Sequence, residues 1–523
     1  MAMRVGELDT PLLRLTPNDY FTVRDACQGV CVMGGIGSGK TSGTGQALAA
    51  AYLTSGMGGI ICCAKPEEAD LWRGYCQRYG RTASLLNFDG VKHGFNFIAY
   101  ELARQGAAGL NSVIECLMRI LEIANAASPN PGRGSEQFWQ DTTRQGLRGT
   151  IPVIYAAKGT VTISDLLRFF RSAPSSPEEM ADPNWQRGNF FCQMFVAARD
   201  KLDDATGDRL IDYWRNDFAK LDAKTRGNIV ISLTTALDRF NHGWLKSAFC
   251  ERTTVVPELC FDGAIILLDM PALTRNEDGI IAQQLFKYMW QRAVLARNAL
   301  PTRYQTRPVF LWADEAQYFI NSYDAEFLST CRGSRACTVF LSQSLPTYYA
   351  KIGGENARDR VHHLLGNFAT RIWHSNACAE TNEWAARTLG RTLQTRRNYS
   401  QGESSNSNFG MNMGEGNNWG TNSSSGGSSS SGPGGSSSGS SWSSGSSSGG
   451  SDNWGRNRGT GSGNNQSWGH SEQMDYLIEP GAFSQILKTG GPANRNRVSA
   501  IWYQAGRTFA ASSGNTLLAE FQQ

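Results

Sequence analysis

One stretch decides the fold of this 523-residue chain: residues 30–54, which read VCVMGGIGSGKTSGTGQALAAAYLT. The four apolar residues that begin it favour a buried strand, and the alanine-rich end favours a helix. Between them, residues 34–41 match the pattern GxxxxGK[ST], in which glycines let successive backbone N–H groups turn inward around a phosphate. The stretch therefore predicts a strand, a phosphate-binding loop and a helix whose amino end faces the ligand.

The residues of this loop have expected roles in holding ATP and Mg²⁺. Lys40 is expected to reach the β- and γ-phosphate oxygens, and Thr41 to offer its hydroxyl to Mg²⁺. The residues expected to bind the nucleotide are Gly34, Gly35, Ile36, Gly37, Ser38, Gly39, Lys40, Thr41 and Ser42. The alternative is a plain turn that matches the pattern by chance.

A second apolar run, Val309–Ala313, is followed directly by Asp314 and Glu315. A parallel strand delivers the residues after it to the carboxyl edge of its sheet, where ligands bind. Asp314 is expected to hold Mg²⁺ through water, and Glu315 to orient and deprotonate an attacking water, which would make the protein an ATPase. Alternatively, the two acids only cap the next helix.

Two further candidates each have an open alternative. Gln343 follows the predicted strand Thr338–Ser342 and either hydrogen-bonds the γ-phosphate or the attacking water, or is a turn residue. Arg332 precedes Gly333 and is either a cation at a helix end or an arginine finger that reaches a neighbouring subunit's nucleotide. Arg335 lies close by, and the sequence leaves open which arginine acts.

The apolar pattern along the chain predicts one α/β domain interrupted by an α-helical domain, an α/β fold of the RecA-like P-loop NTPase type. Its parallel or mixed sheet would be flanked by helices. Further strands are expected at Gly59–Cys63, Ala83–Phe88, Ala264–Asp269, Thr370–Trp373 and Val498–Tyr503. The nucleotide-binding domain would comprise residues 1–107, 251–400 and 473–523, with the all-α domain inserted at 108–250.

A low-complexity tract interrupts the last third of the chain. Of residues 401–470, 52 of 70 are Ser, Gly or Asn. Such a composition cannot bury enough apolar area to offset the entropy of an ordered chain. Residues 401–472 are therefore predicted to be a disordered, flexible insertion at the surface.

Composition excludes some classes of protein and leaves others open. Lys and Arg number 50 against 46 Asp and Glu, which gives a net charge of +4, so the charge by itself does not indicate a nucleic-acid binder. The twelve irregularly spaced cysteines argue against a zinc ribbon or a disulfide framework. No apolar run approaches the roughly 18 residues of a spanning helix, so we expect a cytoplasmic protein without a transmembrane segment.

Three motifs together resemble the TraG/TraD-type coupling proteins of type IV secretion and conjugation, within the FtsK/HerA-like DNA motors. They are GGIGSGKT at 34–41, FLWADEAQ at 310–317 and CRGSRACTVFLSQS at 331–344. Residues 62–67 stand where that family writes an Asp-Pro-Lys-Gly-Glu element, with Cys63 in place of the aspartate. Residues 94–97, 137–140, 385–392 and 490–492 also resemble family landmarks.

This resemblance implies a homo-hexamer with ATP at each interface and DNA in a central channel. It implies that the functional residues of the family's motifs correspond, position by position, to Lys40, Thr41, Asp314, Glu315 and Gln343. Arg332 matches the family's arginine finger by its spacing to Gln343. The implied function is delivery of DNA or nucleoprotein to a type IV secretion machinery, with secretion or relaxosome proteins as partners.

The membrane-spanning segment typical of coupling proteins is missing from this sequence. A separate membrane partner would then recruit the chain to the inner face of the bacterial membrane. Two alternatives stay open: a soluble FtsK/HerA-like DNA translocase in defence, segregation or packaging, and a nucleotide-switched docking protein with slow ATP turnover.

Overall fold

The computed structural model describes residues 7–126, 136–354, 356–410, 420–432, 435–447 and 457–523. The chain forms two compact units: Met1–Gly390 with Tyr476–Gln523, and Arg391–Asp475 between them. The expectations for residues 1–6, 411–419, 433–434 and 448–456 lie outside the described residues. All twelve cysteines carry free thiols.

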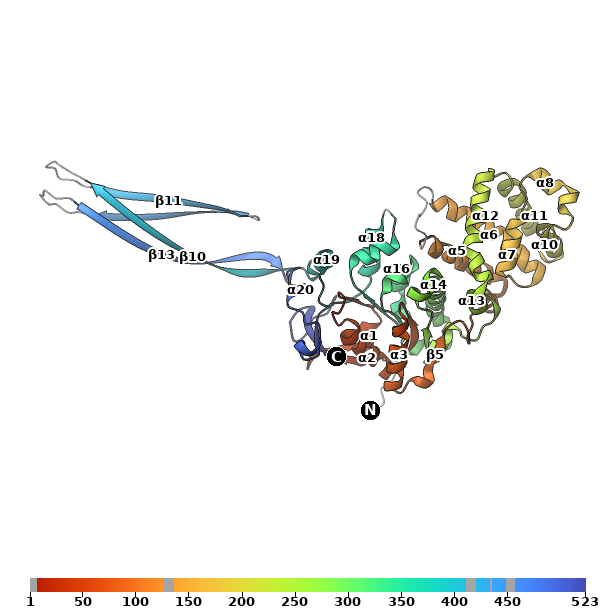
Figure 1. Cartoon of the computed structure of the whole chain (residues 1–523), viewed down its shortest axis with the longest axis horizontal. Helices are drawn as coiled ribbons and strands as arrows, with labels where there is room; N and C mark the ends of the chain where they lie inside the picture. Colours follow the sequence, from red (N-terminus) through yellow and green to blue (C-terminus); the bar gives the residue numbers. More distant parts are fainter. Residues whose placement is uncertain (1–6, 127–135, 355, 411–419, 433–434, 448–456) are drawn as a thin grey trace. The chain divides into compact units, whose positions relative to one another are not determined.

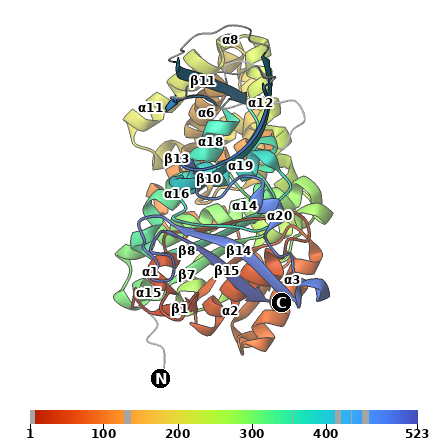
Figure 2. The ribbon, with the colours of Figure 1, turned by 90° about the vertical axis from the view of Figure 1, so that its left-hand side faces the viewer.

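A nine-stranded sheet forms the centre of the first unit (Figure 2). Seven strands are parallel, and β14 and β15 run antiparallel at one edge. The order is β15 (Thr516–Gln522), β14 (Arg497–Gln504), β9 (Thr370–Trp373), β3 (Val30–Met33), β8 (Ala336–Ser342), β7 (Val309–Ala313), β4 (Gly58–Cys62), β6 (Ile265–Leu268) and β5 (Leu85–Phe88). A pair of short strands, β1 (Pro11–Arg14) and β2 (Tyr20–Thr22), stands apart. The strands predicted from the sequence are present within a few residues of their expected limits, whereas β1, β2 and β15 were not predicted.

Helices cover both faces of the sheet because its central strands are apolar on both faces. Along β7, Phe310 and Trp312 belong to one hydrophobic cluster, and Val309, Leu311 and Ala313 to the other. The first face carries α1 (Val23–Ala26), α2 (Gln46–Thr54) and α3 (Pro66–Arg78). The second carries α14 (Ala272–Ala296), α16 (Tyr323–Thr330), α17 (Leu345–Ile352), α18 (Ala357–Gly366) and α19 (Ala379–Leu389). Two further helices of this unit are short: α15 (Thr302–Thr306) precedes β7, and α20 (Ala482–Gln485) precedes β14.

The described residues between 97 and 251 are mostly helical (Figure 1), and this region contains the all-α domain predicted at 108–250. Trp214 is fully buried there among Phe169, Phe170, Phe191 and Phe218. The helices are α4 (Phe97–Gln105), α5 (Leu110–Ala126), α6 (Glu136–Lys158), α7 (Ile163–Arg171), α8 (Pro177–Ala181), α9 (Pro183–Gln186), α10 (Phe190–Ala198), α11 (Asp204–Asp212), α12 (Ala223–Asp238) and α13 (Gly243–Lys246). Their apolar residues join the cluster on the second face of the sheet, so the hydrophobic core is continuous between the two regions.

The second unit differs from the expected structureless tract. Its described residues form two two-stranded sheets. One pairs β10 (Arg391–Gly410) with β13 (Asn457–Tyr476), and in the other β11 (Gly420–Gly432) runs antiparallel to β12 (Gly435–Ser447). Strand pairing satisfies backbone N–H and C=O groups whatever the side chains are, so composition alone did not reveal it. The unit also begins at Arg391, earlier than the predicted residue 401.

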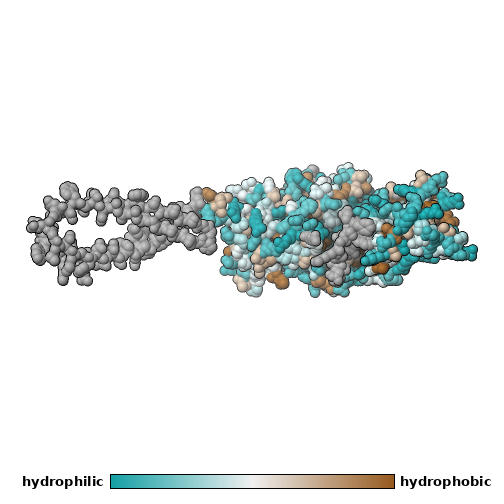
Figure 3. All heavy atoms as spheres, turned by 90° about the horizontal axis from the view of Figure 1, so that it is seen from above, coloured by the Kyte–Doolittle hydropathy of each residue, from teal (hydrophilic) through white to brown (hydrophobic). Residues whose placement is uncertain are grey.

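No helix in the described part of the chain combines the length and apolarity needed to cross a membrane. Figure 3 shows one face of the molecule, on which hydrophilic residues dominate and apolar residues lie scattered. Exposed apolar side chains such as Val196, Ile231 and Leu518 stand on three separate elements. Single apolar residues of this kind are normal on a protein surface.

The two ends of the second unit leave the first unit at one place, where the Leu477 N–H donates to the Gly390 carbonyl at 3.0 Å. We therefore expect that replacing 391–475 with a short Gly-Ser linker leaves the first unit folded. Its thermal unfolding midpoint should match that of the intact chain. Loss of cooperative unfolding in the shortened chain would show that the tract contributes to the core.

Candidate nucleotide-binding site

The glycine loop lies over the carboxyl edge of the sheet, between β3 and α2. The N–H of Gly34 donates to the Ser342 carbonyl at 3.1 Å, and that of Gly35 to the Ser375 carbonyl at 2.9 Å. Gly37 and Gly39 have φ angles of +69° and +81°, which favour glycine. The ends of β8 and β9 thus fix the loop from both sides.

Thr41 and Asp314 meet although 273 positions separate them in the sequence: the Thr41 hydroxyl donates to Asp314 Oδ2 at 2.7 Å. Asp314 follows β7, which is two strands from β3, so its carboxylate reaches the loop across the end of β8. Burial raises the pKa of Asp314, and the charge of Lys40 and the Thr41 hydroxyl oppose that effect. The predicted juxtaposition of loop and acid is therefore present.

Glu315 sits at the centre of a polar network. Its carboxylate accepts from Gln317 Nε2 at 2.9 Å, Gln343 Nε2 at 3.0 Å and Lys65 Nζ at 3.1 Å. Burial acts to raise the pKa of Glu315, but the bonds from Gln317 and Gln343, the charge of Lys40 and the bond from Lys65 outweigh it and lower this pKa. The carboxylate is therefore charged at neutral pH.

The backbone at Glu315 is left-handed, with φ 50° and ψ 48°, a conformation that costs a non-glycine residue about 1–3 kcal/mol. This turn directs the side chain toward Gln343 and away from a helix-capping position, and no capping hydrogen bond is made to the following turn. The geometry thus argues against the alternative that the acid pair only caps a helix.

Gln343 and Gln317 are themselves held in place. Asn376 Nδ2 donates to the Gln343 carbonyl at 2.8 Å, and the Ser342 hydroxyl donates to Gln317 Oε1 at 2.5 Å. Gln343 therefore lies beside Glu315, as its place after β8 predicted. Gln317 was not predicted, because nothing in the sequence indicates which side chain of the turn after Glu315 points back.

The loop after β4 supplies Lys65, which lies in the segment 62–67 where Cys63 replaces the aspartate of the similar family element. The Cys63 backbone N–H donates to Gln283 Oε1 at 2.7 Å, and its carbonyl accepts from Gln283 Nε2 at 2.9 Å. Gln283 is fully buried on α14. A buried amide thus holds the loop that brings Lys65 to Glu315.

Glu68 adds a second carboxyl group near the site. Burial and the neighbouring charge of Asp314 raise the pKa of Glu68 to about 8, and its carboxylate accepts from the Ala64 N–H at 2.7 Å. Glu68 is therefore largely protonated at neutral pH. It stabilises the turn before α3 without adding a full negative charge next to Asp314.

His374 is a further residue that sequence reasoning missed. It is fully buried after β9, and its Nε2 lies 2.8 Å from the Thr44 hydroxyl. Burial and the charge of Lys40 lower the pKa of His374 to about 3, so the imidazole is neutral. His374 follows an apolar strand in the same way as Asp314 and Gln343, but no sequence motif singles out a histidine at such a position.

The two arginines of the segment before β8 are not at this edge of the sheet. Arg332 is exposed and precedes β8, whereas Gln343 follows it. The seven residues of β8 span roughly 20 Å, further than an arginine side chain reaches. Arg335 Nη1 donates to the Thr306 carbonyl at 2.7 Å, which fixes this arginine within its own chain.

The loop residues fit a phosphate and Mg²⁺. Ser38 is 2% exposed, and its hydroxyl has no hydrogen-bond partner among the described residues. Thr41 and Asp314 place a hydroxyl and a carboxylate together, the oxygen donors that Mg²⁺ prefers. Ile36 is 89% exposed at the tip of the loop, and the Ser42 hydroxyl accepts from Gln523 Nε2 at 2.6 Å.

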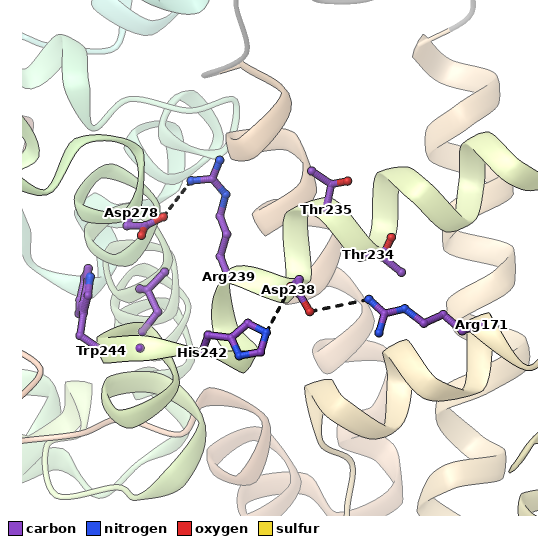
Figure 4. Close-up of a pocket in the computed structure, with 10 residues that line it drawn as sticks. Arg171, Thr234, Thr235, Asp238, Arg239, His242, Trp244 and Asp278 are labelled. Atoms are coloured by element: carbon purple, nitrogen blue, oxygen red, sulfur yellow. Dashed lines mark hydrogen bonds and ion pairs between the residues drawn. The ribbon is translucent and has the colours of Figure 1, made fainter.

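A pocket of about 530 Å³ lies elsewhere, among α7, α12, α13 and the start of α14 (Figure 4). Arg239 Nη1 contacts Asp278 Oδ1 at 2.8 Å, and Asp238 pairs with His242 at 3.4 Å and with Arg171 at 3.8 Å. These polar and charged side chains already contact one another. The pocket contains none of the residues of the nucleotide site.

No protein-family model and no curated protein sequence matches the chain. Among solved structures, it is similar to the bacterial conjugative coupling protein TrwBΔN70 in its unbound monoclinic form. The TM-score is 0.53 at 11% identity, over 99% of this chain and 89% of that chain.

Two further similar structures have lower scores. TrwB in complex with the ATP analogue ADPNP gives a TM-score of 0.46 at 16% identity, over 75% of this chain and 81% of that chain. VirB4 of Thermoanaerobacter pseudethanolicus gives 0.41 at 13% identity, over 74% and 94%.

The likeness to TrwBΔN70 confirms the predicted fold: a mostly parallel sheet flanked by helices, as in P-loop NTPases. The resemblance drawn from the three motifs is confirmed at the level of this fold.

Proposed function

We propose that this protein is an ATP-hydrolysing motor of the coupling-protein type. The observation that carries the proposal is the contact of Thr41 with Asp314 at 2.7 Å, with Glu315 and Gln343 joined beside it. A site for nucleotide binding alone needs the first pair, whereas a buried, charged carboxylate next to it suits the activation of water.

The residues have distinct roles in this proposal. The loop N–H groups and Lys40 bind the phosphates, and Thr41 and Asp314 hold Mg²⁺, which neutralises charge on the phosphate oxygens when bound. Glu315 orients the attacking water and accepts its proton. Gln343 hydrogen-bonds Glu315 and lies where the γ-phosphate end of the ligand would be, and Lys65 and Gln317 position the carboxylate.

The position of Arg332 is an argument for a ring of subunits. The arginine is exposed at the edge of the sheet opposite to its own site, so it can complete a nucleotide site only on another copy of the chain. In closed rings the same surface of each subunit meets a different surface of the next. We propose a homo-hexamer with ATP at each interface and Arg332 acting across it.

We further propose that the protein delivers DNA to a type IV secretion machinery. This function is supported by the motifs and by the fold shared with a protein described as a conjugative coupling protein. The net charge of +4 is compatible with DNA binding, because a sixfold ring repeats each basic pore residue six times. Secretion or relaxosome proteins, with a separate membrane anchor, would be its partners.

The test is ATP hydrolysis with and without duplex DNA, measured beside the native mass. We expect duplex DNA to raise hydrolysis many-fold in a particle of six 57.2-kDa chains, and Lys40→Ala to abolish it. Hydrolysis that DNA leaves unchanged, in a monomer, would contradict the motor and favour the nucleotide-switched docking protein. A DNA-stimulated motor that binds no secretion component would favour the soluble translocase.

A further inference from the structure

The sheet order indicates on which side of the glycine loop the nucleoside part of a ligand would lie. β8 and β7 lie on one side of β3, and they bring Gln343 and Asp314 to the loop. The metal and terminal phosphates therefore belong on that side. The rest of the ligand must extend toward the other side, which is formed by β9, β14 and β15.

The residues on that side come from the end of the sequence. Because β14 is antiparallel to β9 and β15 is antiparallel to β14, the start of β14 and the end of β15 lie at the same edge of the sheet as the loop. Gln523 follows β15 directly and is exposed. Val498 stands at the start of β14, and a Cβ added to Gly39 would come within 2.5 Å of its Cγ2.

Gln523 connects this edge to the nucleotide site itself. Its Nε2 donates to the Ser42 hydroxyl at 2.6 Å, its Oε1 accepts from the Gly491 N–H at 2.9 Å, and its own N–H donates to the Asn496 carbonyl at 2.9 Å. The backbone thus holds the amide beside Ser42. Ser42 directly follows Thr41, in the loop whose backbone N–H groups cradle the α- and β-phosphates in P-loop proteins.

We propose that Gln523, together with Ser42, forms the subsite for the ribose of a bound nucleotide. The inference rests on the proposed function, because it takes the glycine loop as a nucleotide site. A primary amide offers one acceptor and two donors, which suits the vicinal hydroxyls of a ribose, each a donor and an acceptor. Gln523 exchanges its bond to Ser42 for the sugar hydroxyls, while its backbone N–H keeps the residue in place.

The experiment compares ligands that share the phosphates and differ in the sugar: ADP, 2′,3′-dideoxyADP and inorganic pyrophosphate, each with Mg²⁺, by titration calorimetry. In the intact chain we expect ADP to bind about fivefold more tightly than dideoxyADP, the effect of a hydrogen bond of ~1 kcal/mol. Gln523→Ala should weaken ADP about fivefold and leave dideoxyADP and pyrophosphate unchanged.

The matched control is Gln522→Ala, the preceding glutamine, whose side chain projects from the opposite face of the strand and donates to the Arg495 carbonyl at 3.4 Å. It should change none of the three affinities. The proposal is overturned if Gln523→Ala leaves ADP binding unchanged, or if it weakens ADP and pyrophosphate equally.

Failure of the proposed function gives a different result. If the intact chain binds none of the three ligands, and Lys40→Ala gives the same result, the nucleotide site and this subsite are both contradicted. An intact chain that binds pyrophosphate as tightly as ADP overturns the ribose subsite alone and leaves the phosphate site in place.

Discussion

Glu315→Gln should bind ATP with unchanged or higher affinity and hydrolyse it roughly 10³-fold more slowly. The amide keeps the size of the side chain and can still meet Lys65, Gln317 and Gln343, but it cannot accept a proton from water. ATP affinity from equilibrium binding and phosphate release at saturating ATP and duplex DNA would measure the two effects separately.

The matched control for this substitution is Glu67→Gln, the same chemical change at an exposed position two residues from Lys65. It should leave both binding and turnover unchanged. If Glu315→Gln loses tight ATP binding, the carboxylate holds the nucleotide and is not the base. Because the pKa of Glu315 lies below its usual 4.5, its ionisation should contribute no change in rate between pH 6 and 8.

Arg332→Ala should keep ATP binding yet lower turnover by about 10³-fold, the effect of removing an arginine finger. Activity should return in part when this variant is mixed with Glu315→Gln subunits. At a mixed interface the intact Glu315 of the first variant meets the intact Arg332 of the second, so the two inactive proteins complete one site between them.

Arg335→Ala is the comparison that separates the two arginines. Since Arg335 binds the Thr306 carbonyl of its own chain, its loss should lower stability by about 1 kcal/mol and leave turnover largely intact. If mixing Arg332→Ala with Glu315→Gln restores no activity at any ratio, Arg332 is only a cation at a helix end.

The sequence predicted the parts of the site that follow from parallel strands. Asp314 and Gln343 each stand just after an apolar run, and the glycine loop that leads to Thr41 follows another, so parallel strands place all three at one edge. The same rule applies to His374, which follows β9, but a histidine after a strand has no motif that would single it out. Its position became evident only with β9 beside β3.

Other contacts depend on side-chain direction or on distance along the chain, which local patterns do not contain. Gln317 turns back toward Glu315 because of one left-handed residue, and no composition predicts that turn. Gln523 reaches Ser42 across 481 positions by way of the antiparallel edge strands. The Ser/Gly tract was predicted to lack a core, but pairing of its backbone depends on no side chain.

The hydrogen bond between Leu477 and Gly390 brings together the two points at which the second unit joins the first. We therefore expect that insertions of very different length can be exchanged at this point without altering the fold of the first unit. A fluorescent domain placed at the same junction would label subunits for counting how many of each variant enter one particle of the proposed ring.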